Sequence, residues 1–170
     1  AGPSIAFPQG PGFKKISRNE PILVDVSAAL YGYTADHTRI YSLGPIADNL
    51  YQAHQTARQI KQSIIQKARP GVDSKELYDL ACQIAAEAGF GQYFMGQGVS
   101  FVGHGVGLEL DELPVLAKSR RYTMQPGMVL ALEPKFVFPG IGTVGVEDTY
   151  VMTESGLQLL NDLDDDIYVI

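Results

Sequence analysis

The chain has 170 residues and a net charge of −6, a length that suits one domain with a single hydrophobic core. No block of basic residues is longer than two, so the sequence lacks the basic stripe that binds nucleic acid or an anionic membrane surface. No apolar run approaches the length of a membrane span. The single cysteine, Cys82, excludes an internal disulfide framework and fits a reducing compartment, so we expect a cytoplasmic protein.

The first predicted element is a strand hairpin. Two β-branched, apolar runs, over 22–26 and 34–41, flank the turn sequence 31–33. This hairpin places Asp25 roughly opposite Asp36, and like charges directly across an antiparallel pair repel each other. A bound cation would offset that repulsion. The alternative is that one aspartate caps a turn while the other lies in solvent.

Two helices are predicted next. Apolar residues recur at helical spacing from Pro45 to Arg69, and a Pro-Gly pair ends that pattern. Asp73 or Ser74 caps a second helix, which runs to Ala88 before a glycine. A helix pair joined by so short a connection can cover one face of a sheet.

Histidine is scarce in this sequence, and His104 is the one with an unusual setting. It lies in the stretch 101–114 with glycines at 103, 105 and 107, and glycine lets a backbone pass close to another group without steric cost. A backbone of this kind can place the imidazole ring in a crowded site. The alternative is a buried histidine whose ring forms ordinary hydrogen bonds in the core. His54 lies among polar neighbours on the first predicted helix, so we expect it at the surface.

A second strand hairpin is predicted near the C-terminus. A strand over 128–137 and a return over 143–152 flank a Pro-Gly-Ile-Gly turn. Folding at Gly140 places Glu133 directly across from Glu147, the second pair of facing carboxylates. The segments 115–125 and 162–166 carry charge runs and are predicted to be solvated. The order of a strand hairpin, a helix hairpin and a strand hairpin predicts an α+β fold.

Four carboxylates and one imidazole are a donor set suited to a pair of divalent cations. Hard oxygen donors with one histidine suit Mn²⁺, Co²⁺, Fe²⁺ or Zn²⁺. Such a centre lowers the pKa of a water molecule and polarises a carbonyl group, which is the chemistry of hydrolysis.

The segments that carry these residues resemble the motifs of one metallopeptidase family. Residues 24–39 contain Tyr-Gly-Tyr followed by Asp-x-Thr-Arg, similar to an element of the pita-bread metallopeptidases. That group includes Xaa-Pro dipeptidase (prolidase), Xaa-Pro aminopeptidase and methionine aminopeptidase. Residues 103–108 resemble its Gly-His-Gly-Ile-Gly motif, while 132–134 and 146–149 resemble its two glutamate strands. The resemblance covers essentially the whole chain and implies a curved antiparallel sheet covered by helices.

The resemblance also implies a role for each residue. Asp25 would hold one metal ion, Asp36 and Glu147 would bridge two ions, and His104 and Glu133 would hold the second, with Mn or Co expected first and Fe or Zn possible. Glu133 would take a proton from the attacking water and pass it to the leaving amine. Glu133 and His104 are therefore the candidate catalytic residues.

Three positions depart from the family pattern. A substrate-facing histidine is usual seven residues after the ligand histidine, where this chain has Asp111. An earlier histidine aligns with Gln9, and an arginine common before the last glutamate aligns with Gly145. The metal ligands are unaffected, but carbonyl polarisation and substrate choice are in question. Asp111 is the candidate substrate-binding residue.

The resemblance predicts that residues 1–170 form a single catalytic domain without its first elements and without an N-terminal domain. A sheet edge would then be open to a partner chain, so a homodimer is possible. The predicted function is that of a dinuclear metal-dependent exopeptidase of the Xaa-Pro type acting on short peptides. One alternative is a non-catalytic pita-bread module that binds peptides or proteins. A metal-free hydrolase like creatinase shares the fold, but it has no reason to gather four carboxylates against their mutual repulsion.

Overall fold

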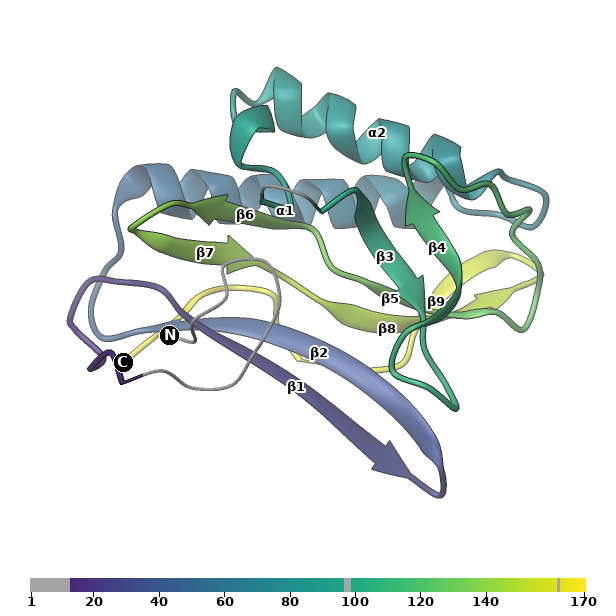
Figure 1. The fold of residues 1–170 in the computed structure, drawn as a ribbon, viewed down its shortest axis with the longest axis horizontal. Helices are drawn as coiled ribbons and strands as arrows, with labels where there is room; N and C mark the ends of the chain where they lie inside the picture. The colour runs from purple at the N-terminus through teal and green to yellow at the C-terminus, as the bar shows by residue number, and fades with distance from the viewer. Residues whose placement is uncertain (1–12, 97–98, 162) are drawn as a thin grey trace.

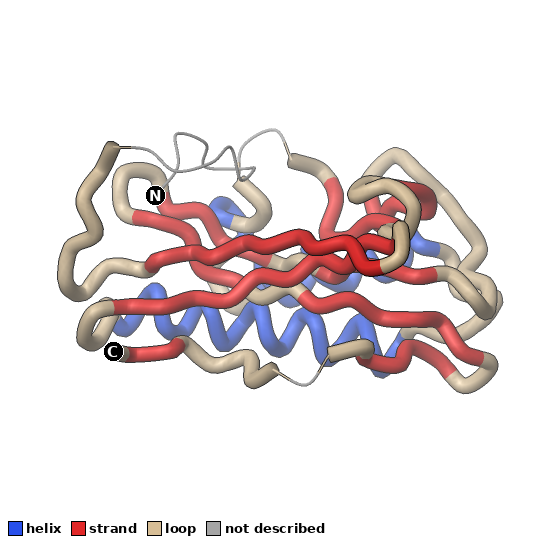
Figure 2. Tube along the Cα trace, turned by 90° about the horizontal axis from the view of Figure 1, so that it is seen from below, coloured by secondary structure: helices blue, strands red, loops and turns tan. Residues whose placement is uncertain are grey.

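Two helices lie over one face of a curved set of strands in the computed structural model, which describes residues 13–96, 99–161 and 163–170 (Figure 1). Gln9 and the rest of the opening segment 1–12 lie outside the described residues. The strands β1 and β2 lie on the side away from the helices, and Figure 2 shows this face with the helices behind it. The elements are β1 (Ile22–Leu30), β2 (Tyr33–Ser42), α1 (Asp48–Lys67), α2 (Ser74–Glu87), the short 3₁₀ helix η1 (Gly91–Tyr93), β3 (Phe101–Gly105), β4 (Glu112–Ala117), β5 (Val129–Leu132), β6 (Lys135–Phe138), β7 (Gly142–Gly145), β8 (Asp148–Thr153), β9 (Gly156–Leu159) and β10 (Tyr168–Val169).

The hairpin β1–β2 forms where the sequence predicts it, with a different register. Tyr31 and Gly32 both have positive φ, 53° and 86°, as a two-residue hairpin turn of the I′ type requires. Asp25 therefore pairs with Thr38, and Ser27 pairs with Asp36. The predicted register, with Asp25 roughly opposite Asp36, differs from the observed register by two residues. The two aspartates are diagonal neighbours on one face of the hairpin, because side chains two residues apart share a face.

The central sheet has the strand order β4-β3-β5-β8-β9, and all of its pairs are antiparallel. Strand β4 corrects the prediction of a solvated loop over 115–125, because Leu116 and Ala117 are buried against β3. The strand predicted over 128–137 divides at Glu133 and Pro134 into β5 and β6. Proline has no N–H to donate to a ladder, which favours a break at that point.

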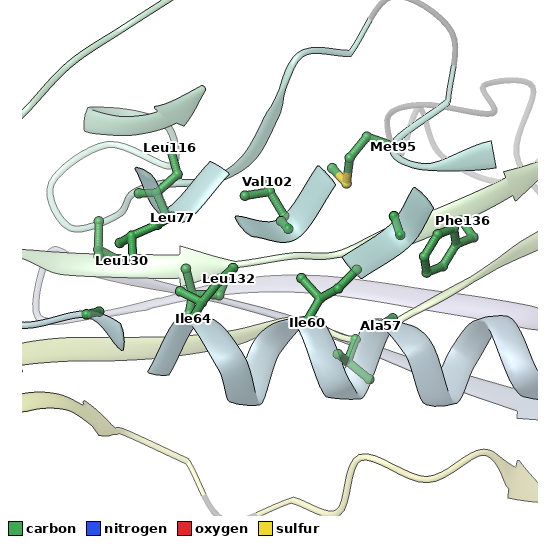
Figure 3. Close-up of a cluster of buried hydrophobic side chains, with 14 of the residues drawn as sticks. Ala57, Ile60, Ile64, Leu77, Met95, Val102, Leu116, Leu130, Leu132 and Phe136 are labelled. Atoms are coloured by element: carbon green, nitrogen blue, oxygen red, sulfur yellow. The ribbon is translucent and has the colours of Figure 1, made fainter. Parts of the chain in front are cut away.

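The two helices were placed correctly, with α1 beginning three residues later than predicted and α2 capped as expected. Asp73 accepts a hydrogen bond from the Lys75 backbone N–H at 2.8 Å. Apolar side chains of α1, such as Ile60 and Ile64, pack against the central strands (Figure 3). Among the described residues, no helix is both long and apolar enough to cross a membrane.

Candidate metal centre

Five separate segments deliver the predicted ligands to one cavity of about 610 Å³. Asp25 lies on β1, Asp36 on β2 and His104 on β3. Glu133 follows β5, and Glu147 precedes β8. All five side chains line the cavity, so the fold brings together every residue that the sequence singled out as a metal ligand.

The imidazole of His104 faces three of the four carboxylates. Its Nε2 atom lies 3.9 Å from Asp36 Oδ2, 3.5 Å from Glu133 Oε1 and 3.9 Å from Glu147 Oε1. All of these side chains are buried. Donor atoms of Asp36, His104 and Glu147 lie within 4.8 Å of one another, which is close enough for one cation to contact all three.

The other oxygen of each of these carboxylates is held by a protein donor. Ser27 Oγ donates to Asp36 Oδ1 at 3.0 Å. Thr38 Oγ1 donates to Glu147 Oε2 at 2.7 Å. These bonds fix the side chains so that the remaining oxygen points toward His104.

The far side of the imidazole is also anchored. His104 Nδ1 lies 2.9 Å from the Gly105 carbonyl oxygen and 3.4 Å from Asp111 Oδ1. Since a carbonyl oxygen only accepts, Nδ1 is the donor of this hydrogen bond, and Nε2 is the ring nitrogen turned toward the carboxylates. The flanking glycine is required by space, because a Cβ at Gly103 would lie 2.6 Å from the Ala131 carbonyl oxygen.

The sequence prediction missed Lys135. This lysine is 5% exposed, and its Nζ lies 2.6 Å from Glu133 Oε2 and 3.9 Å from Asp25 Oδ2. Burial alone would lower the pKa of Lys135, but the charges of Glu133 and Glu147 outweigh it and raise the pKa above its ordinary value. Its position two residues after Glu133 is the signal that could have revealed it, because alternate residues of a strand share a face.

Burial, together with neighbouring carboxylates, raises two further pKa values. Burial, followed by the charge of Glu133, raises the pKa of Glu147 well above its ordinary value. Burial is also the main cause of the raised pKa of Asp25, and Asp36 adds to it. Both shifts show that negative charge is costly in this cavity and that the site favours a cation.

A second buried network holds Glu147 in place through its neighbour Asp148. Arg39 Nη2 donates to Asp148 Oδ1 at 2.6 Å, and Lys61 pairs with the other oxygen. Lys61 also contacts Asp165 Oδ1 at 2.6 Å. The prediction that the acidic run 162–166 is solvated was therefore wrong for Asp165, whose side chain is only 17% exposed.

The histidine predicted to lie at the surface belongs to the same region. His54 is 0% exposed, and its Nε2 lies 2.7 Å from the Asp165 carbonyl oxygen. The C-terminal segment covers this part of α1, so the polar neighbours of His54 in sequence gave the wrong indication.

The profile of metallopeptidase family M24 matches residues 1–154. The chain belongs to this family. It is 33% identical over 159 residues to a Xaa-Pro dipeptidase from Lactobacillus delbrueckii subsp. lactis, a match that covers 93% of this chain and 42% of the relative. The chain therefore spans less than half the length of this Xaa-Pro dipeptidase.

Solved structures agree with this assignment to the M24 family. The prolidase from Pyrococcus horikoshii OT3 superposes with a TM-score of 0.85 at 32% identity, over 94% of this chain and 45% of that one. The X-Pro aminopeptidase from Thermotoga maritima MSB8 superposes with a TM-score of 0.88 at 28% identity, over 98% of this chain and 46% of that one. These matches confirm the predicted α+β pita-bread fold.

The donor set fits the divalent metal ions that the M24 family implies. Imidazole and carboxylate ligands suit several first-row divalent metals. Asp36, His104 and Glu147 are each pre-oriented by a second hydrogen bond, as metal ligands usually are. Asp111 also lines the cavity, but its side chain is 77% exposed. It lies beside His104, so it could contact either that ring or a substrate.

Proposed function

We propose that residues 1–170 act as the catalytic domain of a metal-dependent exopeptidase of the Xaa-Pro type, with short peptides as substrates. The observation that carries the proposal is the convergence of three carboxylate oxygens on His104 Nε2. The names of the relatives, Xaa-Pro dipeptidase and prolidase, support the substrate class.

The proposed metal ligands are Asp36, His104 and Glu147. The sequence also predicts Asp25 and Glu133 as ligands of a two-ion site. Mn²⁺ or Co²⁺ is expected first, and Fe²⁺ or Zn²⁺ would also suit the donors. A divalent ion bound there would supply Lewis-acid catalysis, polarising the scissile carbonyl and lowering the pKa of a water molecule.

Glu133 is the proposed proton carrier. Its Oε1 faces the cavity beside His104, while its Oε2 is held by Lys135. A carboxylate with one fixed oxygen and one open oxygen can accept a proton from the attacking water and deliver it to the leaving amine. Part of the cavity wall is apolar, because Phe101, Leu110 and Leu113 are among its lining side chains. Such a wall suits the ring of a prolyl residue.

The proposal is tested with Glu133→Gln. The variant keeps the size of the side chain but cannot carry the proton, so hydrolysis of a Xaa-Pro dipeptide should fall by at least about 10²-fold. Glu87→Gln, on the exposed face of α2, is the matched control and should be fully active. Circular dichroism of both variants checks the fold. Turnover by Glu133→Gln at the rate of the control would contradict the assigned role.

A second candidate is a non-catalytic module that binds peptides through the same cavity. It is favoured by Asp111, because an aspartate cannot donate a hydrogen bond at neutral pH unless its pKa is raised. A chain that binds Mn²⁺ and a Xaa-Pro peptide but shows no turnover would support this reading. The homodimer and the cytoplasmic location stay predictions.

A further inference from the structure

Lys135 places a positive charge inside the acidic cavity, on the side of Asp25 and Glu133. Its Nζ lies 2.6 Å from Glu133 Oε2 and 3.9 Å from Asp25 Oδ2. The side chain is 7% exposed, so the ammonium group contacts protein oxygens rather than bulk water.

The donor atoms divide into two groups around this ammonium group. Asp36, His104 and Glu147 present atoms within 4.8 Å of one another, which is a sufficient set for one divalent ion. Asp25 Oδ2 and Glu133 Oε2 instead face Lys135, although the other oxygen of Glu133 lies 3.5 Å from His104 Nε2. Asp25 and Glu133 are two of the residues that a second ion would need.

We propose that Lys135 takes the place of a second metal ion, so that the cavity binds one divalent cation on Asp36, His104 and Glu147. The inference rests on the proposed function, and it replaces the two-ion prediction. A divalent ion bound to Asp25 Oδ2 at about 2.1 Å would lie no farther than about 6 Å from the Lys135 ammonium group, in a cavity where water screens little of their repulsion.

The neighbouring strand leaves room for this lysine. Lys135 on β6 pairs with Gly145 on β7. A Cβ at Gly145 would lie 2.5 Å from Lys135 Cβ and 2.6 Å from the Pro134 carbonyl oxygen. The stem of Lys135 therefore occupies its place because Gly145 has no side chain.

The test is the number of Mn²⁺ ions bound per chain. The full chain and Lys135→Met are loaded with excess Mn²⁺, desalted and measured by elemental analysis and by calorimetric titration. Methionine keeps the length of the buried stem and removes its charge. Lys118→Met, at an exposed position, is the matched control. We expect one ion in the wild type and in Lys118→Met, and two ions in Lys135→Met.

Each other outcome is decisive. Two ions in the wild type, or one ion in every variant, would overturn the role of Lys135 and leave the metal centre intact. No ion in any of them would overturn the proposed metal-dependent function as well. If Lys135→Met does not fold, electron paramagnetic resonance of the Mn²⁺-loaded wild type still decides, because an isolated ion and a coupled pair give different spectra. A coupled spectrum would contradict the proposal.

Discussion

Replacing Lys61 with methionine should destabilise the fold strongly, because this lysine is a buried cation. Its side chain is 2% exposed and pairs with Asp148 and Asp165. Burial alone would raise the pKa of Asp148, but Lys61, together with Asn161 and Arg39, keeps that pKa below its ordinary value. The ionised carboxylate of Asp148 therefore depends on the cations around it.

The magnitude follows from what remains after the substitution. Removing one partner of a buried ion pair costs roughly 3–5 kcal/mol. Arg39 still contacts Asp148 at 2.6 Å in the variant, so the lower end, about 3 kcal/mol, is expected. For a chain of this length that loss corresponds to a decrease in Tm of about 6–12 °C.

Lys67→Met on the same helix is the matched control. Lys67 pairs with Glu76 at 3.2 Å, and both side chains are largely exposed, so its loss should cost no more than about 1 kcal/mol. Urea unfolding at pH 7 in the presence of EDTA, followed by circular dichroism, measures both variants without a contribution from bound metal. Equal stabilities of Lys61→Met and Lys67→Met would refute the reasoning.

Two further predictions concern space and protonation. Gly145→Ala should lower the free energy of unfolding by about 2 kcal/mol, because the new Cβ would overlap the backbone opposite it. Gly107→Ala is the control, because the atoms nearest to its new Cβ lie at 3.5 Å, and it should change the free energy of unfolding by less than half as much. Equal losses in the two variants would contradict the steric argument. Burial lowers the pKa of His54 below 6.5. The unfolded chain therefore binds a proton at His54 more readily than the folded chain does. The free energy of unfolding should decrease as the pH falls below 6.5, by up to about 1.4 kcal/mol per pH unit. His54→Gln should remove this component, and parallel stability curves of wild type and variant between pH 7 and 5 would show the interpretation to be wrong.

Local signals in the sequence were enough to predict the elements around the site. The cap at Asp73 and the turns near Gly32 and Gly140 depend on residues close in the chain, and the structure has them where they were expected. The proximity of Glu133 and Glu147 followed from the turn between them. The family motifs supplied the remaining link, because they indicated that two distant hairpins share one cavity.

The missed features depend on contacts between distant segments. His54 looks like a surface residue on a polar helix face until the chain around Asp165 covers it. Lys61 looks like a solvated lysine until Asp148 is packed beside it. Lysine is seldom buried unless a partner offsets its charge. The sequence indicated a metal ion as the only partner of Glu133, so it gave no reason to expect Lys135 in the cavity. Sequence periodicity cannot indicate which polar residues a distant segment will cover.

The most direct test of the account is hydrolysis of a Xaa-Pro dipeptide by the chain before EDTA treatment, after EDTA treatment, and after Mn²⁺ is restored. The account predicts turnover that is lost with EDTA and returns with Mn²⁺, while a dipeptide without proline is cleaved more slowly. Turnover that continues unchanged after the metal has been removed would contradict the central claim. No turnover by a chain shown to carry Mn²⁺ on intact ligands would contradict it equally.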